Sequence, residues 1–176
     1  MSVRNLSRVA LFAALMAICS WVSIPAPVPF TLQTFAVFLA PALLGGKMGT
    51  IAVGTYLLLG AVGLPVFAGF SGGIGVLLGA TGGYLLGFLL TTLVVWLAEI
   101  ALGTSQPVFL ASALVGQGLC YLFGSVWYAL GYAGGTAGLP AVLSTCVLPF
   151  LLPDTAKLIL AWALRKRLAP VLAKSY

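Results

Sequence analysis

The sequence has no histidine, and its only acidic residues are Glu99 and Asp154. Without histidine, serine–histidine triads, histidine metal sites and histidine proton relays are excluded. Paired-carboxylate chemistry needs two acids within a few ångströms of each other, whereas these two are widely separated in the chain. The three cysteines lack the CxxC spacing of zinc sites and redox pairs. We therefore expect no catalytic residues, no metal site and no cofactor, and a function other than that of an enzyme.

Charge of either sign is scarce, since 6% of the residues are charged and 62% are hydrophobic. An ordinary soluble domain has about 25% charged residues, so this composition excludes one. A membrane-spanning helix needs about 20 mostly apolar residues, and the chain has room for six of them joined by short loops. We expect an all-α integral membrane protein, a single domain over residues 1–176 built as a bundle of six transmembrane helices. The expected spans are about 6–24, 31–46, 48–63, 79–102, 107–131 and 139–164.

Basic residues dominate the few charges and give a net charge of +6. In a soluble protein this charge suggests nucleic acid, but here the basic residues flank the apolar segments. They are Arg4, Arg8, Lys47, Arg165, Lys166, Arg167 and Lys174. Because lysine and arginine favour the cytoplasmic side of a bilayer, we expect a multi-pass cell-membrane protein with both termini in the cytoplasm and no nucleic-acid partner. Glu99 is expected near the cytoplasmic end of its helix, in an interfacial role.

The sequence PDTAK at residues 153–157 places two opposite charges inside the last expected span. Asp154 and Lys157 are three residues apart, which puts them on one face of a helix. Ionisable groups at membrane depth are costly and usually functional. Pro149 and Pro153 are expected to break the helix just before the pair. The alternative is an ion pair that only neutralises itself inside the bundle.

Glycine is concentrated between the third and fourth expected spans, in residues 63–75. This segment is uncharged but too rich in glycine for a stable helix interior, so we expect a long structured loop on the outer face. A phosphate-binding loop is discounted because the GxxxxGK[ST] pattern, with its lysine, is absent. The loop either folds over a ligand or serves helix packing.

Small residues recur along the first expected span at positions i, i+3, i+4 and i+7. They are Ala10, Ala13, Ala14 and Ala17. Such a stripe allows two helices to approach closely. The partner helix lies either inside the chain's own bundle or on another protein.

Uncharged polar side chains are few within the expected spans, and any pocket would be lined by some of them. The candidates are Gln33, Thr34, Thr81, Tyr84, Gln117, Tyr121, Trp127 and Tyr128. Taken singly, each is more often a helix-packing or interfacial residue than a ligand contact.

Four stretches together resemble one known family. They are PFTLQTF at 29–35, the glycine-rich segment at 63–75, TGGYLLGF at 81–88 and LPDTAK at 152–157. Spread over nearly the whole chain, they resemble the BioY-type biotin transporters, the substrate-capture (S) components of energy-coupling factor importers. The resemblance implies a six-helix membrane protein that binds biotin near the outer face and delivers it inward. It also implies, as partners, a transmembrane coupling subunit with two cytoplasmic ATPases, and the alanine stripe as the docking face.

For biotin, the resemblance implies a site that combines one charge pair with an apolar and aromatic wall. Asp154 is expected to accept hydrogen bonds from the ureido N–H groups, and Lys157 to donate to the ureido carbonyl or to the carboxylate. The expected binding residues are Asp154, Lys157, Gln33, Thr34, Phe70, Ser71, Gly73, Tyr84 and Trp127. Phe30 and Phe67 are further candidates for the wall.

The chain has no nucleotide-binding motif, so energy for import would come from a partner. Three alternatives remain open. A self-sufficient secondary carrier would use Asp154 as a proton site. An intramembrane enzyme would use Asp154 and Lys157 as acid and base, and a structural membrane subunit would bind no small molecule.

Overall fold

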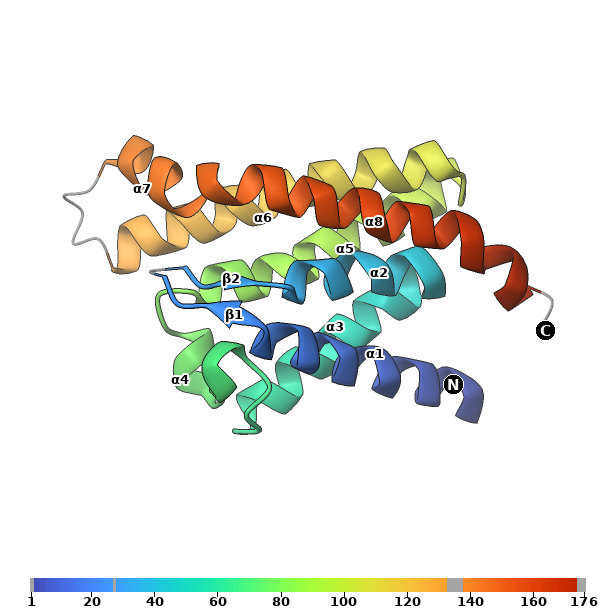
Figure 1. Cartoon of the computed structure of the whole chain (residues 1–176), viewed down its shortest axis with the longest axis horizontal. Helices are drawn as coiled ribbons and strands as arrows, with labels where there is room; N and C mark the ends of the chain where they lie inside the picture. The colour runs from blue at the N-terminus through green and yellow to red at the C-terminus, as the bar shows by residue number, and fades with distance from the viewer. Residues whose placement is uncertain (1, 27, 133–137, 174–176) are drawn as a thin grey trace.

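The structure, a computed structural model, describes residues 2–26, 28–132 and 138–173. Helices make up most of the described chain, and two short strands form a hairpin (Figure 1). The helices are α1 (Val3–Trp21), α2 (Gln33–Leu44), α3 (Gly46–Ala61), α4 (Ile74–Leu77), α5 (Gly82–Leu102), α6 (Gln106–Gly131), α7 (Leu139–Cys146) and α8 (Leu148–Ala173), with a 3₁₀ turn η1 (Ala68–Phe70). The strands are β1 (Ser23–Ile24) and β2 (Phe30–Thr31).

Three of the described helices, α1, α5 and α6, are long and apolar enough to cross a membrane. A fourth candidate consists of α7 and residues 148–168 of α8, which form one span bent by 46° if they are counted together. α2 is apolar, but its 12 residues make it only about 18 Å long, less than the roughly 30 Å hydrocarbon core of a bilayer. The expectation of an all-helical membrane fold is thus met, with three to four candidate spans in the described part of the chain.

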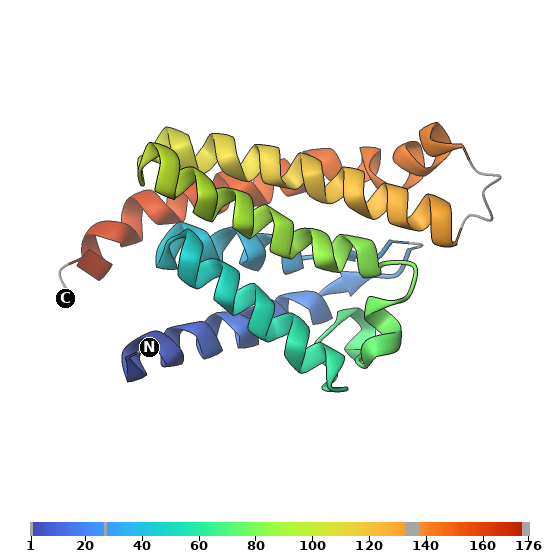
Figure 2. The same cartoon turned by 180° about the vertical axis from the view of Figure 1, so that it is seen from behind.

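α2 lies in the middle of the bundle. It packs against α8 on one side and against α1 and α3 on another. In both views α1 runs along one edge of the bundle while α6 and α8 run along the opposite edge (Figure 1, Figure 2). Nine of the 12 residues of α2 are buried, including its first two, Gln33 and Thr34. A helix that is apolar on all sides is typically buried within a protein. In α2 the two polar residues of the first turn are buried as well.

The segment between α1 and α2 corrects two expected helix boundaries. α1 ends at Trp21 rather than at residue 24, and α2 begins at Gln33 rather than at residue 31. The intervening residues pair as an antiparallel hairpin, with Ser23 opposite Thr31. Proline cannot continue a helix and favours an extended neighbour before it, which explains why this proline-rich stretch leaves helical geometry early. The hairpin brings Thr31 to the edge of the first turn of α2.

A single residue, Gly45, joins α2 to α3. Its φ of 82° is in the left-handed region that favours glycine, so the chain reverses without a longer loop. α3 therefore begins at Gly46, two residues before the expected start of this span. The Glu99 carboxylate accepts a hydrogen bond from the Gly46 N–H at 2.5 Å. A carboxylate at a helix N-terminus is stabilising, so Glu99 helps to fix the start of α3.

α5 and α6 form a closely packed antiparallel pair (Figure 2). A Cβ atom at Gly116 would lie 2.8 Å from the Thr91 Cα, so only glycine permits this approach. The Thr91 hydroxyl also donates to the Gly116 carbonyl at 3.1 Å. Small residues and hydroxyl bonds between helices are typical of packing in membranes. α5 begins at Gly82 rather than at residue 79, and α6 covers 106–131.

The last expected span, 139–164, is not one continuous helix. It breaks at Val147, between α7 and α8, and α8 then continues to Ala173. Pro149 and Pro153 lie within α8, so the expectation that they break the helix beside Asp154 is wrong. Proline is tolerated in the first turn of a helix, and Pro149 is there. Pro153 lies one turn further on, and its missing N–H leaves the carbonyl of Pro149 without its usual helical donor.

The segment between α3 and α5 is fastened to α1. The Ser20 hydroxyl donates to the Val66 carbonyl at 2.6 Å, and the Tyr56 hydroxyl donates to the same carbonyl at 3.0 Å. The Trp21 indole N–H donates to the Pro65 carbonyl at 2.8 Å. A movement of α1 relative to α3 would therefore displace this segment as well.

Candidate binding site

A cavity lies at the end of the bundle that carries the hairpin and α7. It holds about 730 Å³ of empty space, part of it open to the outside. Its polar lining consists of Thr31, Gln33, Thr34, Ser71, Thr81, Tyr84, Gln117, Tyr121, Asp154 and Lys157. Its apolar lining includes Val28, Phe67, Val76, Leu85, Phe88, Cys120, Cys146 and Phe150.

An ion pair on α8 forms the polar end of the cavity. Asp154 Oδ1 lies 2.8 Å from Lys157 Nζ, and both residues are buried, with 3% and 9% of their surface exposed. Residues three apart on a helix share a face, so the spacing seen in the sequence does bring the two charges together. The pair is neutral overall, but burying two charged groups also requires hydrogen bonds to their remaining donors and acceptors.

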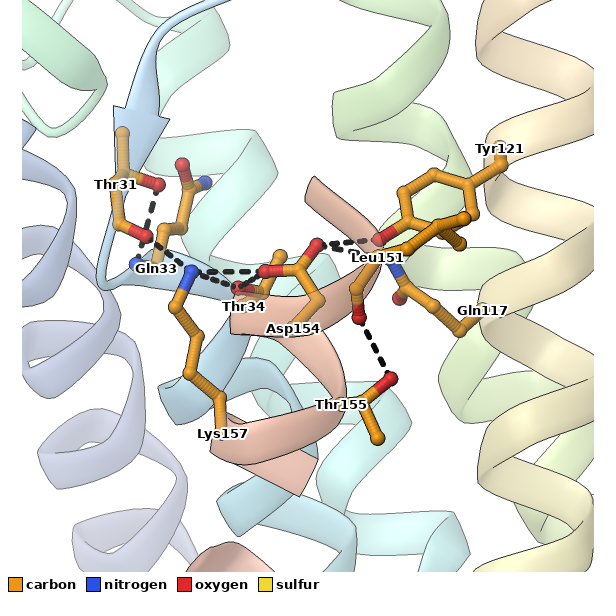
Figure 3. A network of polar contacts seen from close by, with 9 residues as sticks. All are labelled: Thr31, Gln33, Thr34, Gln117, Tyr121, Leu151, Asp154, Thr155 and Lys157. Carbon is orange, nitrogen blue, oxygen red and sulfur yellow. Dashed lines mark hydrogen bonds and ion pairs between the residues drawn. The ribbon is translucent and has the colours of Figure 1, made fainter. Parts of the chain in front are cut away.

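The first turn of α2 and the hairpin supply those bonds to Lys157. Its ammonium donates to the Thr31 carbonyl at 2.6 Å and to the Thr34 hydroxyl at 3.0 Å (Figure 3). The Thr34 hydroxyl in turn donates to Asp154 Oδ1 at 2.8 Å. With its bond to Asp154, the ammonium uses all three of its donors. The cation also lies 5.1 Å from the centre of the Phe30 ring.

The other carboxylate oxygen of Asp154 faces α6. Asp154 Oδ2 accepts a hydrogen bond from the Tyr121 hydroxyl at 2.7 Å and one from the Gln117 side-chain N–H at 3.3 Å (Figure 3). The carboxylate thus accepts four hydrogen bonds, which is about its full capacity. Three helices, α2, α6 and α8, are therefore joined at one buried charge.

Aromatic side chains form an apolar wall of the cavity. Phe67 is 1% exposed and packs edge-on against Tyr56, with ring centres 5.4 Å apart. The Tyr84 ring is buried, and its hydroxyl lies 3.1 Å from the Ser125 hydroxyl. Phe150 stacks on Phe30 at 5.1 Å. The cavity therefore combines one neutral polar cluster with an apolar surface.

Six of the nine expected binding residues line this cavity, and three do not. Those that line it are Gln33, Thr34, Ser71, Tyr84, Asp154 and Lys157. Phe70 is 64% exposed and stacks on Trp21, while the Gly73 N–H donates to the Gly60 carbonyl. The Trp127 indole is directed to the Gly79 carbonyl at 3.0 Å, beneath the start of α5. Phe70, Gly73 and Trp127 therefore lie outside the lining of this cavity.

Gln117, Tyr121 and Phe150 are among the cavity residues outside the expected binding set. Gln117 and Tyr121 were general pocket candidates from their polarity, but the sequence does not indicate that they meet Asp154. Phe150 is four residues before Asp154 and so lies on the same helix face, a signal that could have identified it.

The alanine stripe of α1 divides into two pairs. Ala13 and Ala17 are 2% and 5% exposed and pack inside the chain, so they are unavailable to a partner helix. Ala10 and Ala14 are exposed. The stripe thus serves packing inside the bundle at Ala13 and Ala17, and it leaves Ala10 and Ala14 on the surface of α1.

The chain matches the model of the BioY family over residues 1–174. It belongs to the BioY family. A curated BioY protein, "Biotin transporter BioY" of Thermotoga maritima, is 45% identical over 94% of this chain and 96% of that protein. "Probable biotin transporter BioY" of Pyrococcus horikoshii is 40% identical over 96% of this chain and 98% of that protein.

A solved structure agrees with the BioY assignment. The crystal structure of the S-component for biotin from an ECF-type ABC transporter superposes with a TM-score of 0.83 and 32% sequence identity. The match covers 96% of this chain and 92% of that one. As a BioY protein, the chain is a membrane protein of a transporter family rather than an enzyme.

Proposed function

We propose that this protein captures biotin as the S component of an energy-coupling factor importer. The observation that carries the proposal is the buried, neutral Asp154–Lys157 pair at the polar end of a cavity with an aromatic wall. Both the family and the biotin S-component structure that superposes on the chain support it.

Biotin matches the two halves of the cavity. Its ureido ring carries two N–H donors and one carbonyl acceptor, and we place this ring at the polar end, beside Asp154, Lys157 and Gln117. The thioether ring and the aliphatic chain lie against Phe67 and Phe150, which exclude water from them. The carboxylate points toward the opening, where it keeps its hydration, because the neutral ion pair offers it no net attraction.

The topology follows from the two ends of the bundle. The start of α1 and the end of α8 lie at one end of the molecule, opposite the hairpin and α7 (Figure 1). Basic residues near the start of α1 and near the end of α8 indicate that the first of these ends is cytoplasmic. The cavity then faces the outside, beneath the segment between α3 and α5. α2 and α3 complete six spans, with α2 shielded from lipid by its neighbours.

Partners supply the energy and the docking site. The sequence has no phosphate-binding loop, so ATP is hydrolysed by two cytoplasmic ATPases that act through a transmembrane coupling subunit. Ala10 and Ala14 are exposed on α1, and small exposed residues let a partner helix approach closely. We assign docking to this pair.

Uptake of labelled biotin into proteoliposomes that contain the protein with its coupling and ATPase subunits tests this function. The expected result is uptake that requires ATP on the ATPase side and persists when an uncoupler collapses the proton gradient. Uptake driven by a proton gradient without ATP or partners would overturn the proposal and establish a secondary carrier.

A further inference from the structure

The ion pair in the cavity has no hydrogen-bonding capacity left for a ligand. Asp154 accepts bonds from Lys157, Thr34, Tyr121 and Gln117, and the Lys157 ammonium donates three. A ligand that bonded directly to either charge would have to displace one of these internal partners. The polar groups of a ligand are better satisfied by cavity atoms that have no hydrogen-bond partner within the protein.

One such atom belongs to Gln117. Among the described residues, five buried side-chain nitrogen or oxygen atoms lack a hydrogen-bond partner, and one of them is Gln117 Oε1. The other four belong to Glu99, Gln106, Trp162 and Arg165, none of which lines the cavity. Gln117 is 7% exposed, so this oxygen has lost its access to bulk water. A buried acceptor without a donor is costly, which makes it a place where a ligand donor gains affinity.

The orientation of the Gln117 amide is fixed by Asp154. The Gln117 side-chain nitrogen donates to Asp154 Oδ2 at 3.3 Å, and a carboxylate accepts hydrogen bonds but has no hydrogen to donate. Flipping the amide by 180° would place Gln117 Oε1 next to Asp154 Oδ2, and two acceptors cannot form a hydrogen bond. Figure 3 shows the nitrogen directed toward Asp154 and the oxygen directed away from it. Gln117 lines the cavity, and the side-chain atom that Asp154 leaves without a partner is therefore an acceptor.

Gln117 also borders a second cavity. The membrane beside that cavity cannot supply a hydrogen-bond donor to the Gln117 side-chain oxygen. This cavity lies between α2, α6 and α8 and holds about 410 Å³ of empty space. Besides Gln117, its lining consists of the apolar residues Phe38, Leu114, Leu151 and Leu158, together with Gly118, Tyr121, Asp154 and Thr155. Leu114 and Leu151 are 49% and 42% exposed on candidate membrane-spanning helices. Hydrocarbon outside this face has no hydrogen-bond donor.

We propose that the side-chain oxygen of Gln117 accepts a hydrogen bond from an N–H group of the ligand's cyclic urea, and that Asp154 is the positioning residue that holds the amide in this orientation. The inference rests on the proposed function and names a contact within the same site. The site consequently selects ligands whose urea nitrogens carry hydrogen. An N-alkylated urea would both lose this bond and leave Gln117 Oε1 buried without a donor.

Equilibrium binding to the purified protein in nanodiscs tests the proposal, with biotin and its two N-methyl ureido isomers as probes. The wild type should bind biotin and bind at least one isomer about ten- to a hundredfold more weakly. Gln117→Met should weaken biotin by a similar factor and lose the discrimination between biotin and that isomer. Gln106→Met is the matched control: it removes another unpartnered glutamine from the same helix, outside the cavity, and should bind like the wild type.

The positioning role of Asp154 has its own readout. In Asp154→Asn, residue 154 can present an amide hydrogen to Gln117, so the orientation of the Gln117 amide is no longer fixed. Discrimination between biotin and the N-methyl isomer should therefore fall, in addition to any loss of affinity.

Three results would contradict the proposal. A folded Gln117→Met variant that binds biotin like the wild type would overturn it and would assign Gln117 Oε1 to water from the second cavity. Equal wild-type affinity for biotin and both isomers would overturn it without any variant. A folded wild type that binds no biotin would overturn the proposed function and this inference together, whereas either of the first two leaves biotin capture standing.

Discussion

Asp154 and Lys157 lie one turn apart on α8 with a carboxylate-to-ammonium distance of 2.8 Å, and every further hydrogen bond that they make reaches another part of the fold. The Lys157 ammonium holds the hairpin and the start of α2, and the Asp154 carboxylate holds α6. The pair therefore connects the three segments that surround the polar end of the cavity: the hairpin, the start of α2, and α6.

Removing one charge of the pair should destabilise the protein more than removing both. Lys157→Met leaves the buried carboxylate without its cation, which should lower the free energy of unfolding by about 3–5 kcal/mol. In Asp154→Asn/Lys157→Met the loss should be clearly smaller than the sum of the two single losses, since no buried charge is left unpaired. Denaturant unfolding of the four proteins in one lipid system measures this coupling. Additive losses would show that the two charges do not stabilise each other.

Tyr121→Phe should weaken the polar end of the site without changing its shape. The substitution removes the hydroxyl that donates to Asp154 at 2.7 Å and leaves a charged oxygen with one fewer bond. We expect a loss of about 1–3 kcal/mol of stability and weaker biotin binding. Tyr128→Phe, on the same helix but outside the cavity lining, is the control. Equal effects of the two substitutions on stability and biotin binding would show that Tyr121 has no specific role in the site.

Gly60→Ala should displace the aromatic wall. A Cβ atom there would lie 1.9 Å from the Phe67 ring, which is buried and lines the cavity. Overpacking of this kind typically costs about 1–3 kcal/mol, and we expect biotin affinity to fall with it. Gly54→Ala on the same helix is the control, because its nearest neighbour is Leu89 at 4.0 Å. Retained biotin affinity in Gly60→Ala would show that Phe67 is not needed for binding.

Ala14→Trp should separate capture from import. Ala14 is exposed on α1, away from the cavity lining, so biotin binding by the isolated protein should be unchanged. Import by the assembled complex should fall about tenfold or more if a partner helix packs there. Ala111→Trp, at an exposed alanine of α6, should leave import unchanged. Normal import by Ala14→Trp would show that no partner helix docks on this face of α1.

The sequence identified the parts of the site that depend on local spacing. Long apolar runs predicted α5 and α6, and the three-residue separation of Asp154 and Lys157 predicted one helix face. The hairpin and the break at Val147 were missed because proline marks where a helix is disfavoured but does not specify the extended pairing of Ser23 with Thr31. Proline also fits the first turn of a helix, so Pro149 lies in the first turn of α8, where a break was expected.

Contacts between distant segments account for the remaining differences between the expected binding residues and the cavity lining. Polarity alone made Trp127 a candidate for the pocket, but its indole bonds to the Gly79 carbonyl. Phe70 was assigned to the wall because it is aromatic, but it stacks on Trp21 at the surface. The approach of Gln117 and Tyr121 to Asp154 depends on how α6 packs beside α8, which no local pattern in a single sequence specifies.

Titration of biotin into the purified protein in nanodiscs tests biotin capture most directly. The cavity predicts saturable one-to-one binding that is weakened at least about tenfold in both Asp154→Asn and Lys157→Met. Thr155→Val should bind like the wild type, because Thr155 is exposed on the same helix and does not line this cavity. A folded wild type that binds no biotin, or equal affinity in all four proteins, would contradict the assignment of biotin to this site.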